Sequence, residues 1–203
     1  MKHFLTMAAV IAAALSFNAC DSASSLARDL TGAWSGTPER LFDADASSGT
    51  MIETFSFAAG DTIDNGGQFT VSALMSVTGA LSGAEGITVP VSVTASGYAM
   101  ITGTWQAISA DRVKLLLDES SLMVKVDPDA VVINADMFTG TSAPANMATL
   151  KPQLAESIAA QLRHAVSGRY RPEMTMTGVS VKDGTTLRFK IDKSSYTFSR
   201  QPD

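Results

Sequence analysis

Residues able to carry acid–base or nucleophilic chemistry are scarce in this chain. Beyond the N-terminal segment it contains one histidine, His164, so a Ser-His-Asp triad would have to use that residue. His164 follows Arg163 near the end of a predicted helix. A cation or hydrogen-bond donor at that position stabilises the helix C-terminus. We therefore expect no catalytic residue and no enzyme activity.

Carboxylates are more numerous and stand in four short pairs. Paired carboxylates can bind calcium or perform acid–base chemistry on a glycan. Every pair falls in a predicted turn, where aspartate is favoured because it caps the backbone, and no calcium-loop spacing is present. A zinc site of histidines and cysteines is also excluded. We predict no metal and no cofactor, with carboxylate-based hydrolysis as the least favoured alternative. The pairs are Asp43 with Asp45, Asp61 with Asp64, Asp118 with Glu119, and Asp127 with Asp129.

The N-terminus predicts export and attachment to a membrane. Lys2 precedes an apolar run over residues 4–15, which is too short to span a bilayer and is typical of a secretory signal. The only cysteine, Cys20, follows and resembles the lipid-modified cysteine of bacterial lipoproteins. We predict a lipoprotein signal peptide over 1–19, then a lipidated Cys20 with a polar tether over 20–29. The alternative is an ordinary cleaved signal with an incidental cysteine.

The predicted location is the cell envelope, lipid-anchored at the outer membrane and facing the periplasm or the surface. The charge is unevenly spread along the chain. Lysine and arginine number 5 against 15 acidic residues over 21–150, and 9 against 5 over 151–203. A protein that binds nucleic acid needs a net basic face, so the acidic body argues against such a partner.

Hydrophobic periodicity predicts one domain over 30–203, made mostly of β-strands. Residues 68–77 and 87–96 alternate strictly between apolar and polar side chains, which indicates strands with one buried face. Gly97 separates the second of these from the next strand, and the polar run 43–50 is predicted to be a loop. The predicted strands are 30–37, 51–58, 68–77, 87–96, 98–107, 113–117 and 122–126, with a further short one over 131–134.

The period changes near residue 150. Apolar side chains then recur at spacings of three and four, which predicts an amphipathic helix over 150–167 that ends before Gly168. Strands over 174–182, 187–192 and 196–200 follow it. Asp183-Gly184 favours a tight turn with positive φ, so the first two of these strands should pair directly. The helix is expected to lie across the open end or flank of the sheet.

The two tryptophans stand in nearly repeated motifs, Leu-Thr-Gly-Ala-Trp ending at Trp34 and Ile-Thr-Gly-Thr-Trp ending at Trp105. A glycine two residues before an indole suits a strand that bends or approaches another backbone closely. With Cys20 ahead of them, these motifs resemble the lipocalin-like domains of envelope lipoproteins, particularly those of Bacteroidetes. The resemblance implies a mainly β fold, an antiparallel lipocalin-like barrel or sandwich of about 8–10 strands with one helix.

Two functions remain open at this stage. The first is a non-catalytic envelope lipoprotein whose barrel binds a small hydrophobic ligand. The second is a solid-cored interaction module that serves as an accessory to another envelope protein. A continuous internal cavity would favour the first and a filled interior the second. The predicted ligand-lining residues are Trp34, Phe55, Phe57, Phe69, Met75 and Trp105.

A basic cluster late in the chain has two interpretations. Arg163, Arg169 and Arg171 could together face anionic lipid headgroups beside the anchor. The favoured alternative is a helix end followed by a solvated loop.

Overall fold

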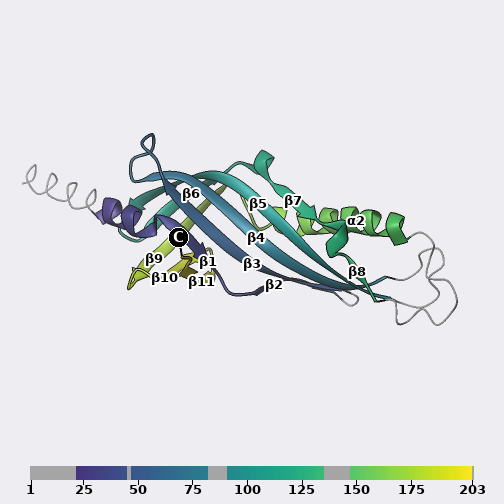
Figure 1. The fold of residues 1–203 in the computed structure, drawn as a ribbon. Helices are drawn as coiled ribbons and strands as arrows, with labels where there is room; N and C mark the ends of the chain where they lie inside the picture. The colour runs from purple at the N-terminus through teal and green to yellow at the C-terminus, as the bar shows by residue number, and fades with distance from the viewer. Residues whose placement is uncertain (1–21, 45–46, 82–90, 135–146, 203) are drawn as a thin grey trace, which may run out of the picture.

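The computed structural model describes residues 22–44, 47–81, 91–134 and 147–202, and within them the chain is mainly antiparallel β-sheet (Figure 1). The strands are β1 (Gly32–Ser35), β2 (Glu39–Ala44), β3 (Ser47–Ala59), β4 (Gly66–Leu81), β5 (Val91–Ser109), β6 (Arg112–Leu117), β7 (Met123–Val126), β8 (Val132–Ile133), β9 (Glu173–Lys182), β10 (Thr186–Ile191) and β11 (Ser194–Arg200).

Eight of these strands close into a barrel, which confirms the predicted fold class. Their order is β1-β11-β10-β9-β6-β5-β4-β3, and the ring closes because β1 pairs with β11 on one side and with β3 on the other. Trp34 in β1 is in register with Arg200 in β11 and with Phe55 in β3. All pairings in the ring are antiparallel, as short strands joined by tight turns predict.

Three strands, β3, β4 and β5, are longer than the barrel and continue beyond it as an open, curved extension. Their lengths are 13, 16 and 19 residues. Beyond the barrel, β2 pairs with the first half of β3, and β7 and β8 pair with the first half of β5. Figure 1 shows β3, β4 and β5 side by side along the whole molecule.

Two predicted interruptions are wrong. Gly97 does not separate two strands, because β5 runs through it in register with Met75 and Val126. Residues 43–44 and 47–50 lie in strands and not in a loop, since β2 and β3 pair from Glu39 with Met51 to Ala44 with Ser47. Residues 45–46 lie outside the described residues. Polar residues form strand there because the outward face of the sheet is exposed to water and accepts serine and threonine. The predicted strand over 87–90, including Pro90, lies outside the described residues.

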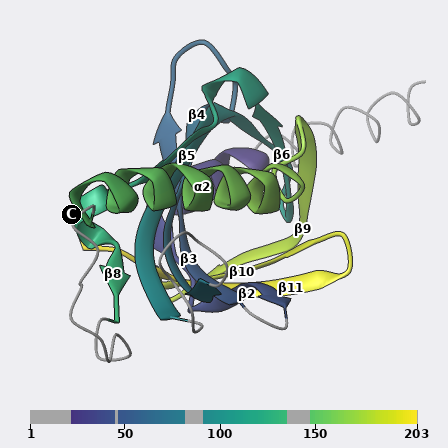
Figure 2. The same ribbon diagram turned by 90° about the vertical axis from the view of Figure 1, so that its right-hand side faces the viewer.

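Helix α2 (Met147–Ser167) confirms the predicted helix and begins three residues earlier. It crosses the inner side of the extension, as Figure 2 shows, and its buried side chains include Leu162 and Val166. Three strands follow it as predicted. Asp183 and Gly184 both have positive φ, 53° and 66°, which is the geometry expected for an Asp-Gly turn between β9 and β10.

Residues 22–30 form a second helix, so the predicted tether is wrong from residue 22 onward. Ala23, Leu26 and Leu30 are buried in the barrel core, and their spacing of three and four places them on one helical face. Ser24 donates a 2.8 Å hydrogen bond to Asn65 in the turn between β3 and β4, at one end of the barrel. The signal peptide and Cys20 lie outside the described residues.

Both tryptophans belong to the same core, as their repeated motifs predict. Trp34 and Trp105 are 0% and 1% exposed. Each motif needs its glycine for a different reason. Gly32 has a positive φ of 123°, whereas a Cβ on Gly103 would lie only 2.0 Å from the backbone oxygen of Leu116. A larger residue fits neither position without strain.

Candidate ligand-binding groove

The six residues predicted to line a ligand cavity are all buried in one hydrophobic core, five of them in the barrel and Met75 in the extension, where it is in register with Gly97. Each is at most 3% exposed. Phe57 meets Trp105 edge to face at 5.3 Å between ring centroids, and Phe55 meets Phe69 in the same way at 5.3 Å. The barrel interior at these positions is therefore occupied by the protein's own side chains: Trp34, Phe55, Phe57, Phe69 and Trp105.

Both indole N–H groups are satisfied by backbone oxygens. Trp34 Nε1 donates to Leu30 at 2.7 Å, and Trp105 Nε1 donates to Ala58 at 3.0 Å. The Arg200 guanidinium also covers the Trp34 ring, 4.2 Å from its centroid. These contacts fix the rings as structural parts of the core and leave no polar group of the indoles for a ligand.

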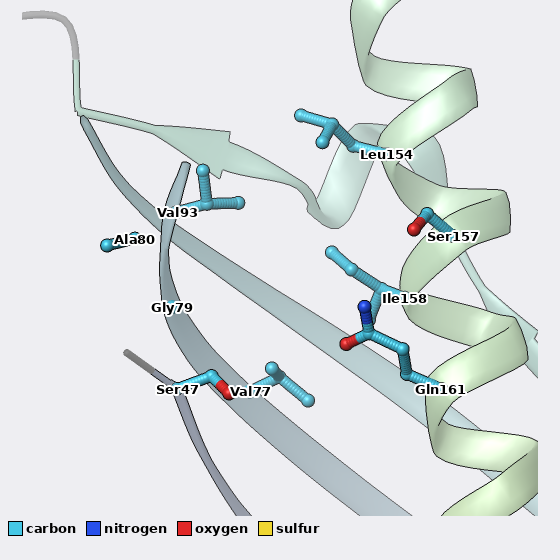
Figure 3. Close-up of a pocket in the computed structure, with 9 residues that line it drawn as sticks. All are labelled: Ser47, Val77, Gly79, Ala80, Val93, Leu154, Ser157, Ile158 and Gln161. Atoms are coloured by element: carbon cyan, nitrogen blue, oxygen red, sulfur yellow. The ribbon is translucent and has the colours of Figure 1, made fainter. Parts of the chain in front are cut away.

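A groove of about 220 Å³ lies outside the barrel, between α2 and the inner face of the extension. In Figure 3 the side chains of α2 point across the gap toward those of the strands. We call it the helix–sheet groove. It is lined by Ser47 on β3, Val77, Gly79 and Ala80 on β4, Val93 on β5, and Leu154, Ser157, Ile158 and Gln161 on α2.

The sequence creates this space in two ways. Strand alternation turns Val77 and Val93 inward, while Gly79, the next inward position on β4, has no side chain to fill the gap. On the opposite side, α2 approaches β5 closely at Gly97, where an added Cβ would lie 2.8 Å from Leu162 Cδ1. The helix therefore packs tightly against β5 and β7 and stands away from the ends of β3 and β4.

The groove has aliphatic walls and a neutral polar rim. Its polar side chains are Ser47, Ser157 and Gln161, which can donate and accept hydrogen bonds but carry no charge. An apolar cavity of about 150 Å³ is large enough to bind benzene. The helix–sheet groove can thus hold a short aliphatic or ring-shaped group and hydrogen-bond a polar end at its rim.

A buried charged cluster lies at the junction of α2 and the barrel. Glu53 on β3 is 4% exposed and accepts hydrogen bonds from Arg169 Nε at 3.0 Å, Arg169 Nη2 at 2.7 Å and the Tyr170 hydroxyl at 2.7 Å. Glu39 on β2 binds Arg169 Nη2 from the other side at 2.7 Å. We call these four residues the Glu53 cluster.

Burial and charge both act on the ionisation of the Glu53 cluster. Burial, the negative charge of Glu53 and the hydrogen bond to Glu53 together raise the pKa of Tyr170 well above its usual value. Burial alone would lower the pKa of Arg169, but the bonds and charge of Glu53 outweigh it, so that pKa is raised. The cluster therefore holds a neutral phenol and a charged guanidinium.

Sequence reasoning missed this cluster, although one signal was present. Glu53 occupies an inward position of β3, between Met51 and Phe55 in the alternating pattern. A carboxylate on the buried face of a strand needs a cationic or donor partner. The less favoured interpretation of the basic cluster was a surface for anionic lipid, and the partners of its arginines give it no support. Arg169 is neutralised by Glu53 and Glu39, Arg171 pairs with Asp192, and Arg163 donates to the Leu122 carbonyl.

The remaining sequence candidates for catalysis or metal binding lie at exposed positions or in turns. His164 is exposed, near Glu119, beside a polar pocket of about 480 Å³. Asp118 and Asp127 cap short 3₁₀ turns, and the bonds from Ser120 lower the pKa of Asp118. Within the ranges described above, no group of three or more histidine, cysteine, aspartate or glutamate side chains is placed to hold a metal ion.

Comparison with known proteins gives no match: no protein-family model matches this chain, and neither does any curated protein sequence. Among the helices that the structure describes, none is long and apolar enough to span a bilayer.

Proposed function

We propose that this chain is a non-catalytic lipoprotein of the bacterial cell envelope that holds a small apolar ligand in the helix–sheet groove. The observation that carries the proposal is the contrast between two interiors. The barrel is filled by its own aromatic side chains, whereas the space beside α2 has aliphatic walls and is open at one side. An apolar concavity with a few neutral hydrogen-bonding groups at its rim is the usual form of a site for a small hydrophobic molecule.

A neutral fluorescent probe such as N-phenyl-1-naphthylamine tests the site directly. The wild-type protein should bind the probe with a rise in fluorescence. Ser157→Trp should weaken binding at least about tenfold, because an indole at this exposed groove position fills the cavity without disturbing the core. Glu156→Trp, at an exposed position on the side of the same helix turned away from the groove lining, should bind the probe like wild type.

The proposal is wrong if the wild-type protein binds no neutral apolar probe, or if Ser157→Trp binds the probe as tightly as wild type does.

Native mass spectrometry of protein purified from its own host then identifies the natural ligand. The second candidate function, an accessory module of an envelope complex, is favoured by the filled barrel. A stoichiometric protein partner in place of a small molecule in that spectrum would support it.

A further inference from the structure

The outer face of β3, β4 and β5 carries no charged side chain in the parts of these strands that the structure describes. Outward positions are the even-numbered residues 48–58 on β3, 68–80 on β4 and 92–106 on β5, because the alternate positions are buried. Charged residues make up 17% of the chain. Depletion of charge over so large an exposed area is a property of the centres of protein interfaces.

Charged residues surround this neutral face. Arg40 and Asp43 on β2 stand opposite Thr50 and Ser48 at one edge. Lys125 on β7 and Lys114 on β6 stand opposite Tyr98 and Gln106 at the other edge. A neutral centre with a charged rim is the usual arrangement of a surface that pairs with another protein.

The centre of the neutral face is a row of apolar side chains that crosses the three strands. Leu74 is in register with Ile52 on one side and Tyr98 on the other, and Leu74 is 65% exposed. Hydroxyl rows flank this apolar row in both directions. Along β4 the outward residues are Thr70, Ser72, Leu74, Ser76 and Thr78, and along β3 they are Ser48, Thr50, Ile52, Thr54 and Ser56.

The five outward residues centred on Ile52 in β3, and the five centred on Leu74 in β4, therefore read as the same residue types in either direction. β5 lacks this pattern, because Ser96 and Met100 flank Tyr98. A half-turn about an axis at the apolar row places threonine or serine against its own kind and the apolar row against itself. An interface between two identical copies requires a patch that is complementary to itself in this way.

We propose that this neutral face is a self-association surface, on which a second copy of the chain packs its apolar row against the first. The net charge of the chain favours a second copy as the molecule that packs on this face. The chain carries a net charge of −5, so charged surfaces of two copies repel each other, while the neutral face lets them approach. The packing is sheet on sheet, with side chains of the two outer faces interdigitating.

The size of the face predicts a weak, reversible dimer. From strand spacing and rise per residue, about seven outward positions on each of the three strands cover about 40 Å by about 14 Å. This gives at most about 560 Å² per copy, because the outside of a closed barrel is convex and only part of it can meet a second copy. About 1,100 Å² in total is at the lower limit for specific protein interfaces. Dissociation constants in the micromolar range or weaker are expected for such an interface.

Sedimentation equilibrium of the purified protein over a micromolar concentration series tests the proposal. Wild type should show a monomer–dimer equilibrium. Leu74→Lys places like charges against each other at the axis and should raise the dimer dissociation constant at least about tenfold. Ile108→Lys, an exposed apolar position at the far end of β5, should leave it unchanged.

A mixture of two variants tests whether the molecule that packs on this face is a second copy of the chain. Leu74→Lys and Leu74→Glu should each be monomeric alone, and an equimolar mixture should dimerise, because the introduced lysine of one copy faces the introduced glutamate of the other only if the two rows meet. A wild-type protein that stays monomeric throughout, or a Leu74→Lys variant that dimerises like wild type, overturns the proposal. A monomeric mixture overturns the row-on-row packing. Circular dichroism checks that every variant is folded.

Discussion

Glu53 is the one charged residue that the structure buries this deeply among the described positions, and it fastens the end of α2 to the barrel. Its two oxygens receive three hydrogen bonds from Arg169 and Tyr170, which lie just beyond the helix. A carboxylate removed from water is stable only with such partners. The Glu53 cluster therefore fixes where the chain leaves α2 and returns to the barrel.

Removing the charge of Glu53 should destabilise the folded protein. Glu53→Gln leaves the half-buried Arg169 with Glu39 alone, so we expect the free energy of unfolding to fall by about 2–4 kcal/mol. Arg40→Gln breaks an ion pair whose side chains are 73% and 51% exposed, and it should cost under about 1 kcal/mol. Urea denaturation measures both. Equal values for the two variants would show that the buried cluster contributes no special stability.

Tyr170 makes stability depend on pH at the alkaline end. Its folded pKa is raised above the unfolded value of 10.0, so its contribution is fully present below pH 10 and is lost as the pH rises toward the folded pKa. Above pH 10 the wild-type protein should lose up to about 1.4 kcal/mol per pH unit through this one proton. Tyr170→Phe should show a shallower decline in urea midpoints over the same range. Parallel declines would mean that Tyr170 ionises normally.

At the scale of elements, the approach of α2 to β5 decides whether the groove exists. Gly97 lets Leu162 come within contact of the strand, as the 2.8 Å separation from a hypothetical Cβ shows. Gly97→Ala should lower the free energy of unfolding by about 1–2 kcal/mol, and Leu162→Ala by about 2–4 kcal/mol. The double variant should cost about 1 kcal/mol less than the two together, because the shorter side chain makes room for the new methyl group. Additive losses in the denaturation series would mean that these two residues do not meet.

Hydrophobic periodicity predicted the helices and strands themselves, but it did not predict how they are placed relative to one another. The strict alternation in β4 and the three-and-four spacing in α2 are local properties, so they can be read without a structure. The groove depends on how far α2 stands from β4, which no local pattern encodes. The aromatic residues of the core show the same limit: their chemistry suits a ligand cavity or a packed interior equally, and only packing decides.

Two misread segments have one physical cause. Residues 22–29 were predicted to be a tether because they are polar, and residues 43–50 to be a loop for the same reason. In each case an apolar residue in the segment or next to it, Leu26 or Phe42, packs against the core, and the second segment is also held by the pairing of β2 with β3. Average polarity is thus a weaker guide to order than the spacing of the few apolar residues.

For the molecule as a whole, the two helices lie at opposite parts of one continuous core. Residues 22–30 close the barrel end beside the turn between β3 and β4, and α2 covers the extension. Figure 1 shows the two helices far apart along the molecule. The fold thus separates a rigid, filled barrel from an open region with a groove. A ligand exchanging at the groove need not disturb the aromatic core.

This layout predicts an orientation on the membrane if Cys20 carries lipid. The helix includes residue 22, two residues after Cys20, and two residues span at most about 7 Å. The barrel end near Asp64 should therefore lie beside the bilayer, and the extension, with Asp129 at its side, should point away. In vesicles with quencher-labelled lipid headgroups, a fluorophore at Asp64→Cys should be strongly quenched and one at Asp129→Cys weakly. A Cys20→Ser background should abolish both effects because the protein then leaves the membrane. Equal quenching at the two positions would mean that the chain lies flat on the surface or is held by a flexible link.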